Sequence, residues 1–139
     1  MITGILLFKH RVFSKKGMDF GTRTLIEVLL KENLYGDILD VGCGYGVIGI
    51  ILSSFFNNKI NSVSMVDVNL RAIHLTKMNI KENKVNNCNA FVSNVYENID
   101  KKYDFIITNP PIRAGKDIVY KILKEAKDYL KENGCLYYV

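Results

Sequence analysis

The sequence has few cysteines and no arrangement of them that would build a disulfide or metal site. Cys43, Cys88 and Cys135 are an odd number, lie far apart and form no Cys-x-x-Cys pair. Neither a disulfide framework nor a structural zinc site is therefore expected. We interpret the three side chains as small apolar groups that are buried in the fold.

Long apolar runs are also missing. Nothing approaches the roughly 20 apolar residues of a membrane span. The run at residues 5–8 is too short for a signal sequence, and basic residues follow it rather than precede it. The chain of 139 residues is 48% hydrophobic and 24% charged, which suits one soluble domain with a buried core. We expect a cytoplasmic protein.

A strong charge bias is absent as well. Nineteen Lys and Arg residues against 14 Asp and Glu residues give a net charge of +5, and there is no long basic block. This mild excess permits nucleic-acid binding without requiring it. Many lysines belong to helix faces, where solvation alone accounts for them.

Segments with helical apolar spacing alternate with short continuous apolar runs. Helices are expected near residues 22–31, 47–55, 70–80 (capped by Asn69) and 118–130, the last ended by Asn133-Gly134. Strands are expected at residues 38–41, 62–66, 90–92, 103–108 and 136–139. The alternation predicts an α/β fold with a largely parallel sheet, and no internal repeat or linker interrupts it.

Four of the predicted strands are followed by a turn that could hold a ligand. These turns contain the glycine-rich segment at residues 40–46, Asp67, Asn94 and the Asn109-Pro110-Pro111-Ile112 segment. The carboxyl ends of parallel strands lie at one edge of a sheet, and ligands bind there near the switch in strand order. We therefore expect the four turns to form one site.

The glycine-rich turn favours a nucleotide-like cofactor. Gly42, Gly44 and Gly46 lack a Cβ, so the backbone can turn sharply and approach a ligand closely. Gly44, Gly46 and Gly49 also fit the dinucleotide pattern Gly-x-Gly-x-x-Gly, so the turn alone does not choose the cofactor. Asp40 precedes it, and an unpaired buried carboxylate at a strand end would need a partner.

Two polar residues at the next strand ends could bind the rest of a nucleoside. Asp67 follows the turn by about 25 residues and could accept hydrogen bonds from both ribose hydroxyls. Its alternative role is to cap the helix at Asn69, and both roles can coexist. Asn94 could bond the adenine edge or could be a plain turn residue.

The Asn-Pro-Pro turn indicates chemistry at an amine. An aromatic exocyclic amine is a poor nucleophile because its lone pair is delocalised into the ring. The Asn109 side-chain oxygen and the Pro110 carbonyl could each accept one amine hydrogen, and the prolines would keep these acceptors rigid. The alternative is a turn that merely ends a buried strand.

Taken together, these stretches resemble the small-domain group of class I S-adenosylmethionine-dependent methyltransferases. That group includes the guanine-N2 methyltransferases of small-subunit ribosomal RNA. The matching stretches are residues 12–22, 40–49, 65–69 and 108–116. The resemblance implies a Rossmann-like sandwich that lacks the family's final antiparallel hairpin. It also implies a single methyltransferase domain over residues 1–139, with its core from about residue 12 and incomplete at both ends.

The resemblance assigns roles to individual residues. Asp40 would face the amino-acid portion of S-adenosylmethionine, and no metal would be needed. The residues implied at the reacting amine are Asn109, Pro110, Pro111 and Ile112. Those implied at the cofactor are Asp40, Gly42, Cys43, Gly44, Gly46, Asp67, Val68, Asn94, Asn109, Phe13 and Thr22, with Asp19 and Gly21 beside them.

The sequence departs from the family after the two prolines. Members often carry Tyr or Phe where this chain has Ile112, to stack on the target base. Phe13, Phe20 and Tyr45 are alternative stacking residues, each with a core or cofactor-wall role as the competing interpretation. His10 and His74 are expected to be structural or solvated.

The implied partner is ribosomal RNA or the small ribosomal subunit, with no membrane and no metal. Four basic residues flank the proposed site and could contact RNA phosphates or could simply be solvated on the surface: Lys15, Lys16, Arg113 and Lys116. The apolar edge at residues 136–139 makes self-association conceivable.

Three other functions remain open on the sequence. Methylation of a protein glutamine amide also uses an Asn-Pro-Pro turn. A nicotinamide-dependent oxidoreductase would also suit Asp67. A truncated domain could bind the cofactor and transfer nothing.

Overall fold

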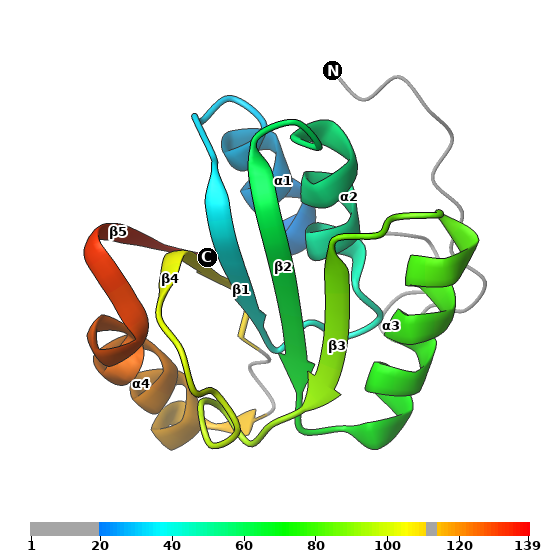
Figure 1. The fold of residues 1–139 in the computed structure, drawn as a ribbon. Coiled ribbons are helices and arrows are strands. Elements are labelled where there is room, and N and C mark those ends of the chain that lie inside the picture. The colour runs from blue at the N-terminus through cyan, green and yellow to red at the C-terminus, as the bar shows by residue number, and fades with distance from the viewer. Residues whose placement is uncertain (1–19, 111–113) are drawn as a thin grey trace.

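A computed structural model describes residues 20–110 and 114–139, which form one five-stranded sheet with helices around it (Figure 1). The strand order is β3-β2-β1-β4-β5, and all four neighbouring pairs are parallel. The predicted α/β class with a parallel sheet is confirmed. In chain order the elements are α1 (Phe20–Leu29), β1 (Gly36–Val41), α2 (Val47–Phe55), β2 (Ile60–Asp67), α3 (Leu70–Glu82), β3 (Cys88–Val92), β4 (Tyr103–Thr108), α4 (Lys116–Glu125), the 3₁₀ turn η2 (Ala126–Tyr129) and β5 (Leu130–Tyr138).

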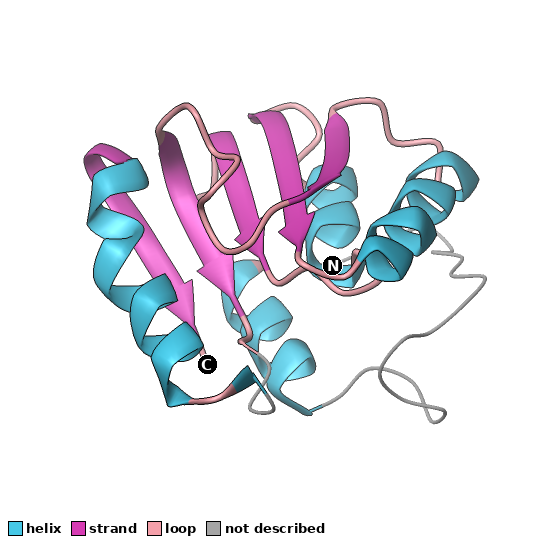
Figure 2. Ribbon diagram, turned by 90° about the horizontal axis from the view of Figure 1, so that it is seen from below, coloured by secondary structure: helices cyan, strands magenta, loops and turns pink. Residues whose placement is uncertain are grey.

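The central strands are apolar on both faces because helices cover both. Ile38, Met65 and Ile107 belong to a buried cluster with side chains of α1, α2 and α3. Leu39 and Ile106 belong to a second cluster with the buried side chains of α4 and η2. Continuous apolar runs are typical of parallel strands buried in this way. Figure 2 shows α4 beside β5, apart from the other three helices.

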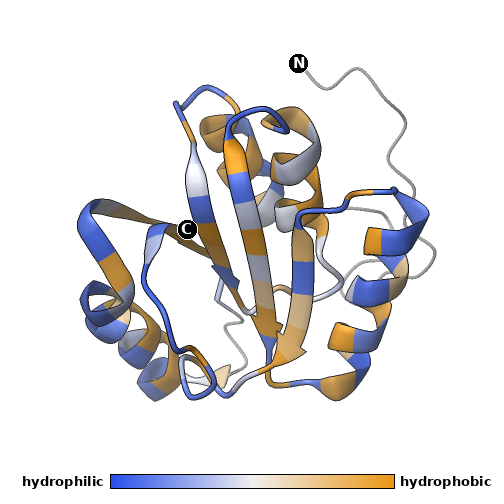
Figure 3. Ribbon diagram, in the orientation of Figure 1, coloured by the Kyte–Doolittle hydropathy of each residue, from blue (hydrophilic) through white to orange (hydrophobic). Residues whose placement is uncertain are grey.

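The helices follow from apolar spacing and, for α3, from a cap. Figure 3 shows hydrophobic central strands and helices with mixed surfaces. The Asn69 side chain accepts hydrogen bonds from the backbone N–H groups of Arg71 (2.8 Å) and Ala72 (3.2 Å), so the predicted cap is confirmed. Within the described part of the chain, no helix combines the length and apolar character needed to cross a bilayer.

The prediction for the last helix was wrong at its carboxyl end. α4 ends at Glu125, and residues up to Leu130 do not continue it. Asn133-Gly134 does not end a helix but lies inside β5, where Asn133 has φ +69°. There the register shifts, because Tyr103 pairs with Leu130 and Phe105 pairs with Cys135. The Asn-Gly pair supplies its left-handed residue to a bulge instead of a helix end.

Charged side chains brace this bulge at the amino-terminal end of the sheet. The Lys131 ammonium of β5 lies 3.0 Å from Asp104 Oδ2 on β4 and 3.1 Å from Asp37 Oδ2 on β1. Burial by itself would raise the pKa of Asp37. Hydrogen bonds from Ser62, Asn61 and Lys131 outweigh burial and lower that pKa to about 2. The cluster therefore fixes β5 far from the strand ends that carry the site.

The bulge makes different demands on its two residues. A Cβ at Gly134 would lie 2.9 Å from the Lys131 carbonyl oxygen and 3.0 Å from that of Asp104. We expect Gly134→Ala to lower the free energy of unfolding by about 1–3 kcal/mol in urea denaturation, because both neighbours are backbone atoms. Asn133→Gly is the matched control and should be close to neutral, since glycine adopts φ > 0 without steric strain. Equal effects of the two substitutions would contradict the bulge.

Candidate functional site

The turns predicted to converge do meet at the carboxyl edge of the sheet. In the sheet register Val41 pairs with Val66 on one side and with Thr108 on the other, and Asp67 pairs with Val92. The chain leaves β1 toward β2 on one side and returns as β4 on the other, so the switch in strand order lies between β1 and β4. The glycine loop after β1 and Asn109 after β4 flank this point.

The glycine loop has a backbone that requires glycine. Gly42, Gly44 and Gly46 have φ values of +77°, +59° and +92°. The N–H groups of Gly42 and Cys43 both donate to the Val66 carbonyl, at 2.8 and 2.9 Å. A Cβ at Gly46 would lie 2.7 Å from Thr76 Cγ2. The loop is therefore bound to the end of β2 and packed tightly against α3.

Two buried polar side chains of α3 hold the loop, and the sequence analysis did not find them. Thr76 Oγ1 donates to the Gly44 carbonyl at 2.8 Å, and Asn79 Nδ2 donates to the Tyr45 carbonyl at 2.9 Å. Thr76 lies four residues after Ala72, and Asn79 lies three residues after Thr76, so all three share the buried face of α3. Polar residues in phase with an apolar stripe were the available signal.

Asp67 connects the glycine loop to α3. Its Oδ2 accepts from Gly44 N–H and its Oδ1 from Asn69 N–H, both at 2.9 Å. Asp67 therefore does help to start α3, as predicted, because it accepts a hydrogen bond from the cap residue Asn69. Each carboxylate oxygen has more than one acceptor position, so these bonds orient Asp67 and leave it able to accept from hydroxyl groups.

Asp40 is buried without a hydrogen-bond partner. The residue is 1% exposed, and neither carboxylate oxygen has a partner in the described structure. Burial, with a smaller contribution from the Asp67 charge, raises the pKa of Asp40 to about 7. The backbone N–H of Gly49 lowers the pKa of Asp40 by a smaller amount. Its contact with the carboxylate does not have the geometry of a hydrogen bond. A carboxylate in this state is suited to a cationic or hydrogen-bond-donating ligand group.

Cys43 and Tyr45, also in the loop, are buried. The Cys43 thiol lies 3.7 Å from the Gly44 carbonyl oxygen and 3.8 Å from Thr76 Oγ1. Burial, together with the nearby charge of Asp40, raises the pKa of Cys43, so the thiol stays neutral. Tyr45 belongs to the core cluster, which matches its core interpretation rather than a stacking role.

The two predicted site residues just beyond β2 and β3, Val68 and Asn94, are exposed. Val68 is 67% exposed next to Asp67. Asn94 is exposed in the turn after β3, and its carbonyl accepts from Glu97 N–H at 3.2 Å. Ser93 ties this turn to the site, because its backbone N–H donates to the Asp67 carbonyl at 3.0 Å.

The turn after β4 is anchored on both sides of its asparagine. Thr108 is fully buried, and its Oγ1 donates to the Val41 carbonyl at 2.9 Å. Asn109 Nδ2 donates to Thr22 Oγ1 of α1 at 2.9 Å. The structure thus brings together two predicted site residues that are 87 positions apart, and it buries Pro110 beside them.

Several predicted residues are placed differently or are not described. Phe20 is 83% exposed at the start of α1, so its core interpretation was wrong. His74 is exposed on α3, as expected for a solvated residue. The remaining predicted residues lie outside the described part of the chain: Phe13, Asp19, Pro111, Ile112, His10, Lys15, Lys16 and Arg113.

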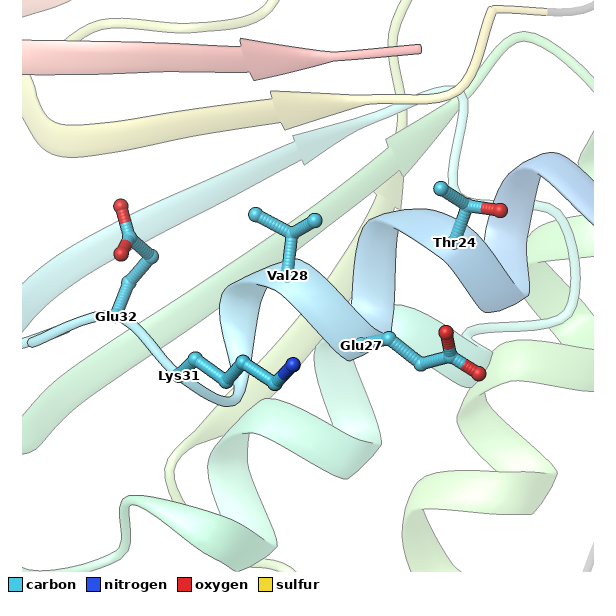
Figure 4. Close-up of a pocket in the computed structure, with 5 residues that line it drawn as sticks. All are labelled: Thr24, Glu27, Val28, Lys31 and Glu32. Carbon is cyan, nitrogen blue, oxygen red and sulfur yellow. The ribbon is translucent and has the colours of Figure 1, made fainter.

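A shallow hollow on α1 contributes nothing to this site. Its walls are Thr24, Glu27, Val28, Lys31 and Glu32, which all come from α1 and the turn after it (Figure 4). No residue of the strand ends lines it. We assign it no role in ligand binding.

Comparison with solved structures and with family models identifies first the fold and then the class of protein. A structure named as a S-adenosylmethionine-dependent methyltransferase, from Clostridium acetobutylicum, matches 88% of this chain and 51% of its own. The TM-score is 0.66 and the identity is 20%, so this likeness concerns the fold, which is that of class I methyltransferases. The chain belongs to the Methyltransferase small domain family, whose sequence model matches residues 4–139. S-adenosylmethionine is the cofactor of this class.

Two curated relatives extend well beyond the matched region. The protein called YbxB of Bacillus subtilis (strain 168) is 44% identical over 130 residues, which cover 92% of this chain and 64% of that protein. The "Ribosomal RNA small subunit methyltransferase C" of Mannheimia succiniciproducens is 36% identical over 129 residues, covering 90% of this chain and 38% of that protein. The chain thus spans less than two thirds of either relative.

The unpartnered state of Asp40 has a measurable consequence for stability. Its pKa is about 7 in the folded protein against 3.8 ordinarily. The folded state therefore binds the proton more tightly than the unfolded state, and folding is penalised as the pH rises from about 4 to 7. We expect Asp40→Asn to raise the free energy of unfolding by roughly 2–4 kcal/mol at pH 8.

This gain should be clearly smaller at pH 5 and should vanish only below about pH 4, where the carboxyl is protonated in the unfolded state as well as in the folded state. Denaturant unfolding of both proteins at the two pH values checks it. A gain that is the same at pH 5 and pH 8 would show that the charge of Asp40 is not its cause.

Proposed function

We propose that this domain transfers a methyl group from S-adenosylmethionine to an exocyclic amino group, and that its target is the N2 of a guanine in ribosomal RNA. The observation that carries the proposal is the anchored Asn109 turn, next to a glycine loop and an unpartnered carboxylate. The cofactor supplies an activated methyl group when bound. The remaining work of the site is positioning and electrostatics.

The residues around the glycine loop fit the cofactor. Asp67 is already oriented by two backbone bonds and would accept from the ribose hydroxyls. Asp40 would accept from the amino group of the methionine portion, which gives its orphaned oxygens a partner. Gly42, Gly44 and Gly46 would allow the backbone to approach the ligand. Val68 and Asn94 would flank the adenine, and Cys43 would line the loop.

Asn109 and Pro110 would act on the target amine. The Asn109 side-chain oxygen and the Pro110 carbonyl would each accept one amine hydrogen. Holding both hydrogens localises the nitrogen lone pair as the nitrogen becomes tetrahedral. No covalent enzyme intermediate is needed, and acceptors fixed in advance stabilise the developing charge without reorganisation. Pro111 and Ile112 would complete the turn.

Ribosomal RNA is the substrate that the relatives and the exposed side chains near the turn favour. Relatives at 36% identity are named for small-subunit ribosomal RNA methylation. A base within RNA must leave its stack to reach such a turn. Phe20, exposed two residues before Thr22, offers a stacking face for it. Lys116 is exposed at the start of α4 and could contact a phosphate of the RNA. A protein that methylates ribosomal RNA would act in the cytoplasm, where ribosomes assemble.

Cofactor binding can be tested apart from catalysis by calorimetric titration with S-adenosylhomocysteine. Asp67→Ala should weaken binding by about 10-fold or more, because it removes the ribose acceptor and the tie to Gly44. Wild-type affinity for S-adenosylhomocysteine should also fall from pH 8 to pH 6. At pH 6 Asp40 is mostly protonated and must release its proton before it can accept the ammonium group of the ligand. Asp40→Asn should bind weakly and lose this pH dependence. Unchanged affinity in both variants would overturn the cofactor assignment.

Catalysis can be tested by tritiated methyl transfer to small ribosomal subunits, with release factors as the competing substrate. We expect incorporation into ribosomal RNA and a loss of about 100-fold or more in Asn109→Ala. That variant should keep wild-type affinity for S-adenosylhomocysteine. Incorporation into a release-factor glutamine would replace the RNA proposal. Cofactor binding with no incorporation into either substrate would identify a binding domain without activity.

A further inference from the structure

Thr22 is a polar residue on the buried face of a helix. α1 buries Thr22, Leu25, Ile26 and Leu29, which follow the spacing of an amphipathic helix. Thr22 is 7% exposed, similar to its apolar neighbours on this face. A buried hydroxyl group destabilises the fold unless it is hydrogen-bonded. Valine has almost the same shape, so the hydroxyl must be explained by its contacts.

The hydroxyl contacts the asparagine of the proposed catalytic turn. Asn109 Nδ2 donates to Thr22 Oγ1 at 2.9 Å. The side-chain amide is planar, so holding its nitrogen fixes the direction of its oxygen. The oxygen is the atom that the proposed function assigns to the target amine.

The backbone at Asn109 is fixed by other contacts. Thr108 is in register with Val41 of β1, and its hydroxyl donates to the Val41 carbonyl at 2.9 Å. Pro110 on the other side is buried. Loss of the Thr22 hydroxyl would therefore remove a hydrogen bond from the amide nitrogen and leave the turn in place.

We propose that Thr22 is a positioning residue whose hydroxyl holds the Asn109 side-chain amide in the orientation that presents its oxygen to the target amine. This inference rests on the proposed function, because it concerns how Asn109 meets the amine. It differs from the role that family resemblance gives to Thr22, which is contact with the cofactor. The two roles predict different kinetic effects.

The test compares Thr22→Val with Thr22→Ser in steady-state methyl transfer. Thr22→Val should lower kcat by about 10- to 100-fold, because a small misplacement of a reacting group is enough for such a loss. The KM for S-adenosylmethionine and the affinity for S-adenosylhomocysteine should stay within about 2-fold of wild type. Thr22→Ser keeps the hydroxyl and should restore most of kcat. Loss of cofactor affinity with unchanged kcat would overturn the inference in favour of the cofactor role.

A double-mutant cycle separates action through Asn109 from a general effect on folding. In an Asn109→Ala background, Thr22→Val should cause no further fall in kcat, since the group that it positions is gone. Additive losses would overturn the inference. Thermal unfolding of each variant shows whether the fold is retained.

The same inference has a readout that needs no turnover. In ¹⁵N-labelled protein, the side-chain NH₂ resonances of Asn109 should shift and exchange faster with water in Thr22→Val than in wild type or Thr22→Ser. Unchanged resonances in Thr22→Val would overturn the positioning role even if the wild type transferred no methyl group. Absence of turnover in the wild type, with the shift observed, would count against the proposed function alone.

Discussion

The carboxylate of Asp67 joins two segments on which the whole site depends. One oxygen accepts from the glycine loop after β1 and the other from the residue that caps α3. Because α3 also holds the loop through Thr76 and Asn79, the loop is bound from three directions. This bonding fixes a backbone of left-handed glycines that would otherwise be free to move. The other groups of the site are placed relative to this loop.

Asp40 shows the opposite arrangement, a group that the fold buries and does not satisfy. Nearly all buried polar groups in proteins have partners, yet both oxygens of Asp40 lack one among residues 20–110 and 114–139. The raised pKa expresses this unfavourable burial. A ligand group that donates hydrogen bonds or carries positive charge would relieve this penalty, in keeping with the proposed cofactor site.

Local patterns predicted most of the elements because their causes are local. Apolar runs before the glycine turn and before Asn109 predicted β1 and β4, and the cap at Asn69 marked the start of α3. Asn133-Gly134 was misread because a left-handed residue ends a helix or makes a bulge equally well. The choice was made by β4, which pairs with residues on both sides of the bulge.

The sequence by itself determined the α/β class, the turns of the site, and the residue types able to bind a nucleoside and an amine, because each depends on spacing within a few residues. Only the tertiary structure decided which of these groups touch. The contact of Thr22 with Asn109 and those of Thr76 and Asn79 with the glycine loop span 87, 32 and 34 positions. Such contacts depend on strand order and helix packing, which bring distant segments together. The sequence could mark a polar residue on an apolar helix face, but it could not name the partner of that residue.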